Sequence, residues 1–401
     1  MHELRELVEV RFDYAVSFTE GVFQCENPLL RSTLIKEEKG RRHRAWAVID
    51  RGVMDAWPDL DRALTSYFEA YPADLEQIAP PLVVEGGEAV KNDEATFRHI
   101  LRRVHELRID RHSYILAIGG GAVLDVVGYA AAVAHRGVRL VRFPTTVLGQ
   151  ADSGVGVKNG INAFGKKNFL GTFAPPFGVL CDVDFLRTLS ARDRIAGMSE
   201  AIKVALVRDA TFFAWLRAHA GALGQGDARA VAELVQRSAA LHLRHIATSG
   251  DPFEMGSARP LDFGHWAAHK LESLTSHRLR HGEAVAIGMA IDTLYSARAG
   301  LCSPALADAV LGLLDHIGFR SWDDALDLRG PDGRPCILEG LAEFREHLGG
   351  ELTVTLLRGP GDGIEVHEML ESGILAALDV LRARAHGRRS LRPASIPVAA
   401  P

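Results

Sequence analysis

The sequence predicts an α/β domain built on a doubly wound, mostly parallel sheet, followed by a mainly α-helical domain. Strands alternate with helices through about residue 185, which is the pattern of a parallel sheet with helices on both faces. From Leu186 onward helices dominate. A chain of 401 residues is also too long for one ordinary core. We therefore expect one domain over residues 1–185, a second over residues 186–385, and a basic, proline-rich and disordered tail over residues 386–401.

The composition limits the partners that we expect. Charged residues make up 24% of the chain, the formal net charge is −5 and no long basic run occurs, which argues against nucleic acid. The four cysteines lie far apart without a CxxC pair, which indicates reduced thiols. The start of the chain shows no secretory signal, and the most apolar helix, residues 122–134, is too short to span a bilayer. These features favour a cytoplasmic protein that contacts neither nucleic acid nor membrane.

The first strands predicted along the chain lead to an acidic residue. Residues 8–18 alternate apolar and polar side chains, and an opening strand and hairpin are expected over about residues 7–35. Residues 45–49 form an apolar run that ends at Asp50. An acidic residue at this end of a strand is well placed to accept hydrogen bonds from ribose hydroxyls, although it can also simply cap the next helix.

The next strand and helix add polar residues at the same edge of the sheet. A strand is expected at residues 81–85, and a helix from residue 88 to 107 begins with Glu88 and Lys91. On a helix such a pair is usually a solvated ion pair. Both residues nevertheless follow the carboxyl end of a strand, where doubly wound sheets bind their ligands.

The stretch from residue 115 to 171 is the most informative in the chain. An apolar strand ends in Gly119-Gly120-Gly121, and a helix follows with Asp125 in its first turn. Glycines let backbone amides approach a ligand closely, and the amino end of a helix favours a phosphate or pyrophosphate. A second strand leads into Thr145 and Thr146. Because these residues fall at carboxyl ends of strands, we expect a phosphate-bearing cofactor at this edge of the sheet.

A loop rich in glycine, lysine and asparagine follows, from residue 150 to 168. It carries Asp152 and Lys158, and it ends in Lys167 and Asn168. Three lysines and three asparagines lie within its last dozen residues. Side chains of this kind suit a phosphorylated polyol, because ammonium groups attract phosphate and amides hydrogen-bond to hydroxyls.

The helical part carries a second group of chemically active side chains. Glu200 and Lys203 lie one turn apart on one expected helix. His265 and His269 have the spacing of two metal ligands on another helix, and His281 starts a third, twelve residues later. Histidines and a carboxylate from separate helices indicate a metal site with an open position for substrate.

Helical periodicity predicts the remaining elements. Ser190 is the expected N-cap of the first helix, with Asp193 in the capping-box position, and this helix is expected to run past Glu200 and Lys203. One late strand is expected at residues 352–357. Further helices are expected at residues 210–220, 228–248, 264–274, 282–299, 304–317 and 366–384.

In this order and spacing, the motifs resemble the sugar phosphate cyclase family, whose best-known type is 3-dehydroquinate synthase. The resemblance spans about residues 45 to 320 and rests on Gly119 to Asp125, Pro144-Thr145-Thr146, Asp152 to Lys158, Lys167-Asn168, Glu200 to Lys203, Phe263-Gly264-His265 and His281 to Ala286. It implies a Rossmann-like NAD-binding domain followed by a mainly helical metal-binding domain. The activity implied is that of a lyase that cyclises a seven-carbon sugar phosphate with NAD and a divalent metal, zinc or alternatively cobalt.

The resemblance also implies roles for individual residues. The metal would be bound by Glu200, His265 and His281. Catalysis would involve Lys158, Lys203, Asp152 and His269. The substrate phosphate would be held by Lys158, Asn168, His269 and, in a homodimer, Arg136 of the partner subunit. NAD would be held by Asp50, Glu88, Lys91, Gly119, Gly120, Gly121, Asp125, Thr145, Thr146 and Lys167.

The implied reaction is an oxidation that is later reversed. Polarisation of a carbinol by the metal lets a hydride leave to NAD, and the ketone formed acidifies the adjacent carbon. Phosphate is then eliminated, the hydride returns, and an intramolecular aldol step closes the carbocycle. The lysines stabilise negative charge on phosphate and enolate.

Three positions indicate which substrate is used. In dehydroquinate-forming members, the resemblance places a lysine, an arginine and an asparagine against the substrate carboxylate. This chain has Arg244, Arg259 and Asp262 in that part of the sequence. An aspartate would repel a carboxylate at short range by about 1 kcal/mol or more. We therefore expect sedoheptulose 7-phosphate and a valiolone-type product, with the heptulosonate 7-phosphate of 3-dehydroquinate synthase as the alternative.

Two other classes of function are weighed against a cyclase. A metal-dependent alcohol dehydrogenase of related fold would share the glycine turn and the histidines, but it would have little use for Lys158, Lys167 and Lys203 together. A non-catalytic binding protein would be expected to have lost some of the five residues Lys158, Lys203, Glu200, His265 and His281. Because the lysines and the expected metal ligands all remain, we expect a cyclase.

Overall fold

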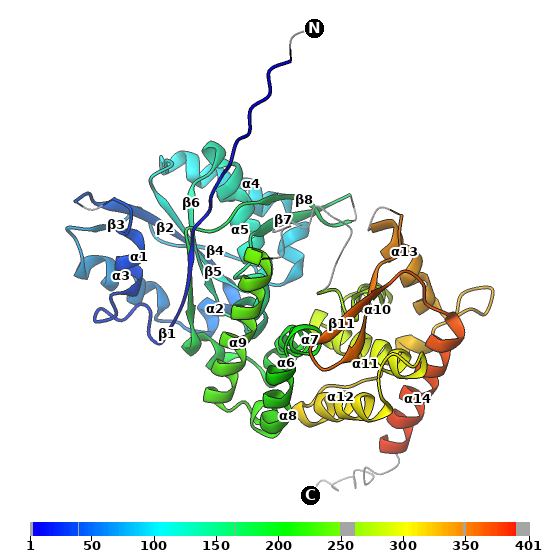
Figure 1. Cartoon of the computed structure of the whole chain (residues 1–401). Helices are drawn as coiled ribbons and strands as arrows, with labels where there is room; N and C mark the ends of the chain where they lie inside the picture. The colour runs from blue at the N-terminus through cyan, green and yellow to red at the C-terminus, as the bar shows by residue number, and fades with distance from the viewer. Residues whose placement is uncertain (1–2, 39, 165, 249–260, 348–349, 390–401) are drawn as a thin grey trace, which may run out of the picture. The chain divides into compact units, whose positions relative to one another are not determined.

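The computed structural model describes residues 3–38, 40–164, 166–248, 261–347 and 350–389 (Figure 1). The chain divides into two compact units, Met1–Leu189 and Ser190–Pro401. Most of the expected tail, from residue 390 onward, lies outside the described residues. Its first residues, 386–389, were wrongly assigned to a tail, because they complete the last helix, α14 (Glu371–Arg389).

The first unit is built on a parallel sheet. Its strand order is β1-β9-β6-β5-β2-β3, with β4 also paired to β2, and every pair is parallel. The strands are β1 (Ala15–Thr19), β2 (His43–Asp50), β3 (Leu75–Gln77), β4 (Leu82–Val84), β5 (Tyr114–Gly119), β6 (Arg139–Pro144) and β9 (Gly178–Asp182). The fold class expected from the alternation of strands and helices is therefore confirmed.

Alternate side chains of the central strands belong to two separate cores. On β2, Ala45 and Ala47 pack into one core, and Trp46 and Val48 pack into the other. Helices α1 and α3 close the first core, and α4 and α5 close the second. The helices of this unit are α1 (Leu29–Leu34), α2 (Arg51–Ala56), α3 (Leu60–Ala70), α4 (Glu94–Glu106) and α5 (Gly121–Val133). Because β5 is buried along its whole length, its sequence is a continuous apolar run.

The opening hairpin expected over about residues 7–35 is wrong. Only Ala15–Thr19 forms a strand, and it pairs in parallel with β9. Residues 3–14 have no regular structure, and Val8, Val10 and Phe12 are 80%, 68% and 58% exposed. Period-two alternation identifies a segment that can form a strand, but a strand also needs a hydrogen-bonding partner. Among the described residues, residues 3–14 pair with no strand.

Two further segments of this unit differ from expectation. The helix expected from residue 88 to 107 is divided, because η1 (Glu88–Asn92) ends at Asp93, whose side chain caps α4. The polar stretch after residue 150 is a π-helical turn, η3 (Gly149–Ser153), followed by an antiparallel hairpin of β7 (Lys158–Ala163) and β8 (Lys166–Phe173). Because β8 is exposed along most of its length, its sequence lacks the apolar–polar alternation that indicates a half-buried strand.

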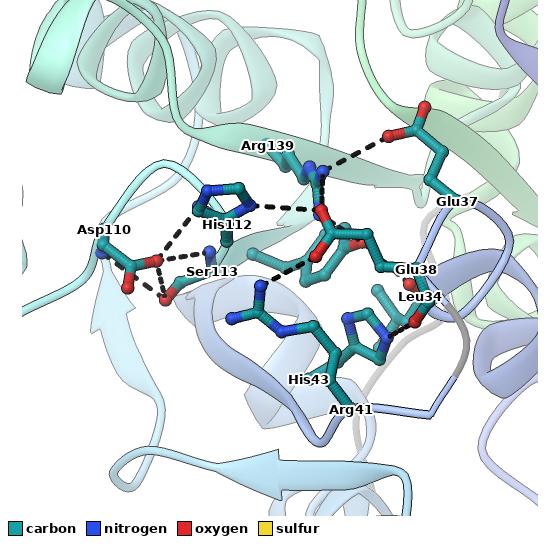
Figure 2. A network of polar contacts seen from close by, with 10 residues as sticks. Leu34, Glu37, Glu38, Arg41, His43, Asp110, His112, Ser113 and Arg139 are labelled. Carbon is teal, nitrogen blue, oxygen red and sulfur yellow. Dashed lines mark hydrogen bonds and ion pairs between the residues drawn. The ribbon is translucent and has the colours of Figure 1, made fainter.

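A polar network around Glu38 joins the amino ends of three central strands (Figure 2). Its carboxylate accepts hydrogen bonds from Arg139 at the start of β6 (2.5 Å) and from Arg41 (2.7 Å), and it lies 3.1 Å from Nδ1 of His112, just before β5. The backbone oxygen of Glu38 lies 2.8 Å from Nε2 of His43, at the start of β2. The residues expected to bind a cofactor lie at the other ends of these strands, so we assign this network to stability.

The Glu38 network gives the stability of the protein a defined pH dependence. Hydrogen bonds from Arg139 and His112 lower the pKa of Glu38 from its ordinary value of 4.5 to about 2. A carboxyl with a lowered pKa contributes stability above its unfolded pKa and loses it as the pH falls toward the folded value. We expect Glu38→Gln to melt at a lower temperature than wild type at neutral pH, with a difference that shrinks as the pH falls from about 4.5 toward about 2.

Thermal melts of the two proteins across this range test the prediction. Glu69→Gln is the control, because Glu69 is an exposed carboxylate on α3 of the same unit. A Glu38→Gln deficit that stayed constant with pH would show that the charge of Glu38 contributes nothing.

The second unit is mainly helical. Its central helix, α11 (His281–Arg298), packs against α7, α10, α12 and α14 and is buried on nearly all sides. The other elements are α6 (Ala191–Gly197), α7 (Ser199–Arg208), α8 (Ala210–Gln225), α9 (Ala228–Thr248), α10 (His265–Leu274), α12 (Pro304–Ile317), α13 (Glu339–His347), β10 (Val354–Gly359) and β11 (Asp362–Val366). Within the described part of the chain, no helix combines the length and apolarity that a membrane span requires.

Local signals in this unit are partly confirmed. Ser190 caps α6 as expected, because its side chain accepts a hydrogen bond from the backbone of Asp193. The helix does not continue through Glu200, since it breaks at Met198 and α7 then begins. The late strand is not alone either, because β10 pairs with β11, and the helix expected from residue 366 begins only at Glu371.

Candidate metal centre and cofactor-binding edge

Three helices of the second unit bring together one carboxylate and two imidazoles. Glu200 lies in the first turn of α7, His265 is the first residue of α10 and His281 is the first residue of α11. Oε1 of Glu200 lies 3.7 Å from Nε2 of His265 and 3.4 Å from Nε2 of His281. One potential ligand atom from each residue lies within 4.8 Å of the others. The three side chains expected to bind metal are therefore neighbours in space.

This donor set fits a divalent transition metal. Glu200 is 3% exposed, and its buried Oε1 atom accepts no hydrogen bond of good geometry among the described residues. A buried carboxylate oxygen without a donor is costly unless a cation faces it. Two imidazole nitrogens and one carboxylate oxygen are typical ligands of catalytic zinc, which keeps a further position for water or substrate.

Each imidazole has an acceptor at its other ring nitrogen. Nδ1 of His265 lies 3.2 Å from the backbone oxygen of Phe263, and Nδ1 of His281 lies 3.4 Å from Oε2 of Glu272. A proton on Nδ1 leaves the lone pair on Nε2, the nitrogen nearer to Glu200, and Nε2 can then bind a metal. Sequence reasoning missed Glu272, although it follows His265 on the same helix by two turns.

Burial and nearby charges set the protonation of the cluster. Burial raises the pKa of Glu200, but the ammonium of Lys203, its ion-pair partner, and the two imidazoles outweigh burial and hold that pKa well below its ordinary value. Burial and the charge of Lys203 lower the pKa of His265. Burial also acts to lower the pKa of His281, yet Glu200 and Glu272 raise it to about 10. A metal ion would displace this proton, because only neutral imidazole binds a metal.

Close backbone contact fixes the start of α10 against α11. Gly264, the N-cap of α10, has a φ of +80°, which few other residues adopt. A Cβ atom on Gly288 of α11 would lie 2.0 Å from the backbone oxygen of Gly264. The buried carboxylate of Asp292 accepts hydrogen bonds from the amide of Gly264 (2.9 Å) and from Nε1 of Trp266 (2.8 Å). These contacts hold the turn that carries the first histidine of the cluster.

The other residues expected in the second unit lie at varied positions. His269 is exposed one turn after His265, with ring centroids 5.5 Å apart. The backbone oxygen of Asp262 accepts a hydrogen bond from the amide of His265 (3.0 Å), so Asp262 belongs to the turn that starts α10. Arg244 is exposed on α9. Arg259 lies outside the described residues.

In the first unit, the glycine triplet forms the turn between β5 and α5. Gly119 ends the strand, Gly120 is the N-cap and Gly121 begins the helix. A Cβ atom on Gly119 would lie 3.0 Å from Cβ of Asp50, and one on Gly121 would lie 2.7 Å from Oγ of Ser153. The turn therefore has room for backbone alone. This is the condition under which amides at a helix amino end can approach a phosphate.

Asp50, Thr145 and Thr146 border this turn. The amide of Thr145 donates to the oxygen of Gly119 (3.0 Å), and a Cβ atom on the second glycine would lie 3.3 Å from Cγ2 of Thr146. Asp50 ends β2 and caps α2 by accepting from the amide of Gly52 (2.8 Å). Burial raises the pKa of Asp50 against these backbone hydrogen bonds. The capping role left open by the sequence is therefore present.

Lys91, Asp125 and Asn168 form a second polar cluster in this unit. Lys91 is 5% exposed, its Nζ atom lies 2.6 Å from Oδ2 of Asp125, and it also donates to Oδ1 of Asn168. Glu88 accepts a hydrogen bond from the amide of Asn162 (3.3 Å), whose Oδ1 atom accepts from the backbone of Asn168 (2.8 Å). The alternative of a solvated ion pair between Glu88 and Lys91 does not hold, because Lys91 is buried against α5 and β8.

Arg142 organises the segment that carries Asp152 and Lys158. It is fully buried on β6 and donates to the backbone oxygens of Gly154 (3.1 Å), Gly156 (2.8 Å) and Lys158 (3.0 Å) and to Oδ1 of Asn159 (2.6 Å). Asp152 is partly exposed in η3, and Lys158 is exposed at the start of β7. Sequence reasoning missed Arg142, and the available signal was an arginine inside an otherwise apolar strand.

Exposed charged and aromatic side chains follow on the surface of the same unit. Lys167 is exposed on β8, and Arg136 is exposed after α5 with a φ of 61°. Phe164 and Phe169 are 85% and 49% exposed, and their rings contact each other with centroids 5.4 Å apart. These side chains are accessible to a ligand or to a second protein.

The first unit is a parallel sheet with a glycine turn, and the second is a helical unit with a carboxylate–imidazole cluster. The chain is therefore a two-unit α/β protein with a candidate metal centre. The family models for the 3-dehydroquinate synthase N-terminal and C-terminal parts match residues 81–196 and 197–330. The 3-dehydroquinate synthase of Roseobacter denitrificans is 39% identical over 308 residues, which cover 76% of this chain and 82% of that protein. The chain therefore belongs to the 3-dehydroquinate synthase-like family of sugar phosphate cyclases.

Solved structures agree with this assignment. The 2-epi-5-epi-valiolone synthase of Streptomyces hygroscopicus subsp. jinggangensis, with NAD+ and Zn2+ bound, is 29% identical with a TM-score of 0.81, covering 95% of this chain and 100% of that chain. A 2-deoxy-scyllo-inosose synthase complexed with carbaglucose-6-phosphate, NAD+ and Co2+ is 23% identical with a TM-score of 0.70, and the match covers 92% of this chain and 96% of that chain. The expected dehydroquinate synthase-like fold is therefore confirmed.

Proposed function

We propose that this protein is an NAD- and metal-dependent cyclase that eliminates phosphate from a seven-carbon ketose phosphate and closes a carbocyclic ring. The observation that carries the proposal is the group of Glu200, His265 and His281, with Lys203 paired to its carboxylate, in a chain of this family. A group of this kind can bind a metal and hold a positive charge beside it, as the oxidation and elimination steps require.

NAD and a metal ion would supply the redox and Lewis-acid chemistry. When bound, NAD takes up and returns a hydride, and the metal ion polarises the oxygen at the reacting carbon. Glu200, His265 and His281 would hold the metal, for which zinc is preferred because of the mixed nitrogen and oxygen donors. The glycine turn at Gly119–Gly121 and the polar residues beside it would hold NAD.

Charged side chains would stabilise the negative charge that develops during elimination. Lys203 is 6% exposed, and a buried ammonium acts on nearby charge more strongly than one in water. Lys158 and His269 are exposed and would bind the substrate phosphate, together with the amide of Asn168. Asp152 would accept hydrogen bonds from substrate hydroxyls.

The heptulosonate 7-phosphate is the better supported substrate. The relative at 39% identity is a 3-dehydroquinate synthase, and the share of both chains that is matched is large. This reaction is the one that the sequence analysis treated as the alternative.

Sedoheptulose 7-phosphate is the second candidate, and Asp262 favours it. Asp262 lies in the turn that precedes His265, where its charge would repel a substrate carboxylate. The neighbouring structure with a TM-score of 0.81 is a valiolone synthase.

A paired assay separates the two substrates. The protein is incubated with NAD and zinc and with each sugar phosphate separately, and inorganic phosphate is followed together with a mass-resolved cyclic product. If the heptulosonate is the substrate, Asp262→Asn should raise kcat/KM for it by about fivefold, since about 1 kcal/mol of repulsion is removed. Asp308→Asn, an exposed change on α12, is the control. Phosphate release from sedoheptulose 7-phosphate alone would make that sugar phosphate the preferred substrate. Phosphate release from neither substrate would contradict the proposed reaction.

We also propose a homodimer, in which Arg136 of the partner subunit reaches the substrate phosphate. The exposed aromatic pair Phe164 and Phe169 supports it, because apolar surface of this kind is commonly buried in an interface. Light scattering should give a mass of about twice 43.6 kDa. Phe164→Asp with Phe169→Asp should lower that mass. A fully active monomer would contradict the proposal.

A cytoplasmic location is part of the same proposal. All four cysteines are free thiols in the structure, which suits a reducing compartment.

A further inference from the structure

We infer that Glu272 is a positioning residue of the metal centre, holding the ring of His281 so that Nε2 faces the metal. The inference rests on the proposed metal-binding function of Glu200, His265 and His281. It adds a fourth residue that would bind no metal itself.

The ring of His281 lies between two carboxylates. Its Nδ1 atom is 3.4 Å from Oε2 of Glu272, and its Nε2 atom is 3.4 Å from Oε1 of Glu200. An imidazole that donates from Nδ1 to a carboxylate has a fixed tautomer and ring orientation, with its lone pair on Nε2. Glu272 therefore determines which nitrogen of His281 is presented to the cluster.

The two histidines differ in how much the fold alone constrains them. The side chain of His265 is 10% exposed, and its Nδ1 atom contacts the backbone oxygen of Phe263 two residues away. The side chain of His281 is 33% exposed, and its acceptor comes from a different helix, α10. Because His281 is less enclosed, its orientation depends more on one side-chain contact.

Burial of Glu272 also indicates a specific role for its charge. The residue is 4% exposed, and a buried carboxylate is costly unless it is paired or hydrogen-bonded. Its backbone oxygen separately accepts a hydrogen bond from the amide of His277 (2.8 Å), which shapes the turn after α10. Side-chain substitutions leave that backbone contact in place, so they test the carboxylate alone.

The test compares Glu272→Ala and Glu272→Gln in the full-length protein after metal removal. Zinc dissociation constants are measured by competition with a chromogenic chelator, and the metal-free proteins are melted. We expect Glu272→Ala to bind zinc about 10- to 100-fold more weakly, the loss typical when such a partner of a metal-binding histidine is removed. Glu272→Gln should lose less, because its amide oxygen can still accept from Nδ1.

Glu343→Gln is the matched control. Oε1 of Glu343 on α13 accepts a hydrogen bond from Nζ of Lys270 (2.6 Å), which lies on α10 like Glu272. The zinc affinity of the Glu343→Gln variant should stay within about twofold of wild type. The cobalt-substituted proteins give an independent signature, because a shifted visible spectrum in the Glu272 variants reports altered ligand geometry.

Each outcome bears on a different claim. Wild-type zinc affinity in Glu272→Ala would overturn the inference and leave the metal centre standing. Equal weakening in Glu343→Gln, or a fall in the melting temperature of metal-free Glu272→Gln as large as that of Glu272→Ala, would assign Glu272 a merely structural role and also overturn it. Wild-type protein that failed to bind zinc would remove the proposed metal centre itself.

Discussion

Replacing Glu200 with alanine is expected to abolish both metal retention and turnover in a chain that remains folded. The substitution removes the carboxylate of the cluster and leaves His265 and His281 beside the ammonium of Lys203. Two imidazoles alone hold zinc weakly, and the metal supplies several kcal/mol of stabilisation to the charged transition states. We therefore expect turnover to fall by about 1000-fold or more. Metal content by mass spectrometry and phosphate release by a coupled assay measure the two effects.

The variant should still fold but with reduced stability, because the ammonium of Lys203 stays buried after the carboxylate of Glu200 is removed. Circular dichroism checks this, and Glu233→Ala serves as the control, since Glu233 is a surface carboxylate that pairs with Arg237 on α9. His265→Ala should behave like Glu200→Ala. Normal metal content with unimpaired turnover in either variant would show that the cluster is not the metal site.

Gly288→Ala is expected to have the largest effect on stability. The added Cβ atom would lie 2.0 Å from the oxygen of Gly264, and backbone on both sides leaves no flexible side chain to move aside. Overpacking of this kind costs about 3 kcal/mol or more, so α10 must move away from α11. Because α10 begins with His265, zinc affinity should fall together with the melting temperature. Urea unfolding and zinc titration measure both.

Gly312→Ala is the matched control for this change. Gly312 also lies in a helix, α12, and no atom comes within 4 Å of a Cβ atom built there. Alanine at such a site should leave the protein unchanged or stabilise it by up to about 1 kcal/mol. If Gly288→Ala were as stable as Gly312→Ala, the tight contact between α10 and α11 would be disproved.

The fold class could be predicted because periodicity and burial are local signals. The apolar runs at β2 and β5 and the glycine turn after β5 are explained by a sheet covered on both faces. The elements that were predicted wrongly are strands or apparent strands, whose formation depends on a hydrogen-bonding partner. Residues 8–14 alternate like a strand but pair with none among the described residues, while β8 is an exposed strand without such alternation that pairs with β7.

The candidate site was predicted in part for a similar reason. Glu200, His265 and His281 belong to recognisable motifs, so their meeting in space was expected from the family resemblance. Arg142 and Glu272 belong to no such motif, and their importance comes from the contacts that burial imposes on them. Long-range hydrogen bonds of buried polar groups cannot be read from spacing along the chain.

The central claim is a phosphate elimination that uses NAD without net redox change. The most direct measurement records inorganic phosphate and NADH absorbance in the same reaction, with zinc, NAD and the preferred sugar phosphate. We expect one phosphate for each cyclic product and no accumulation of NADH over many turnovers. NADH that rises in step with substrate consumption, without phosphate release, would contradict the account and identify an alcohol dehydrogenase of related fold.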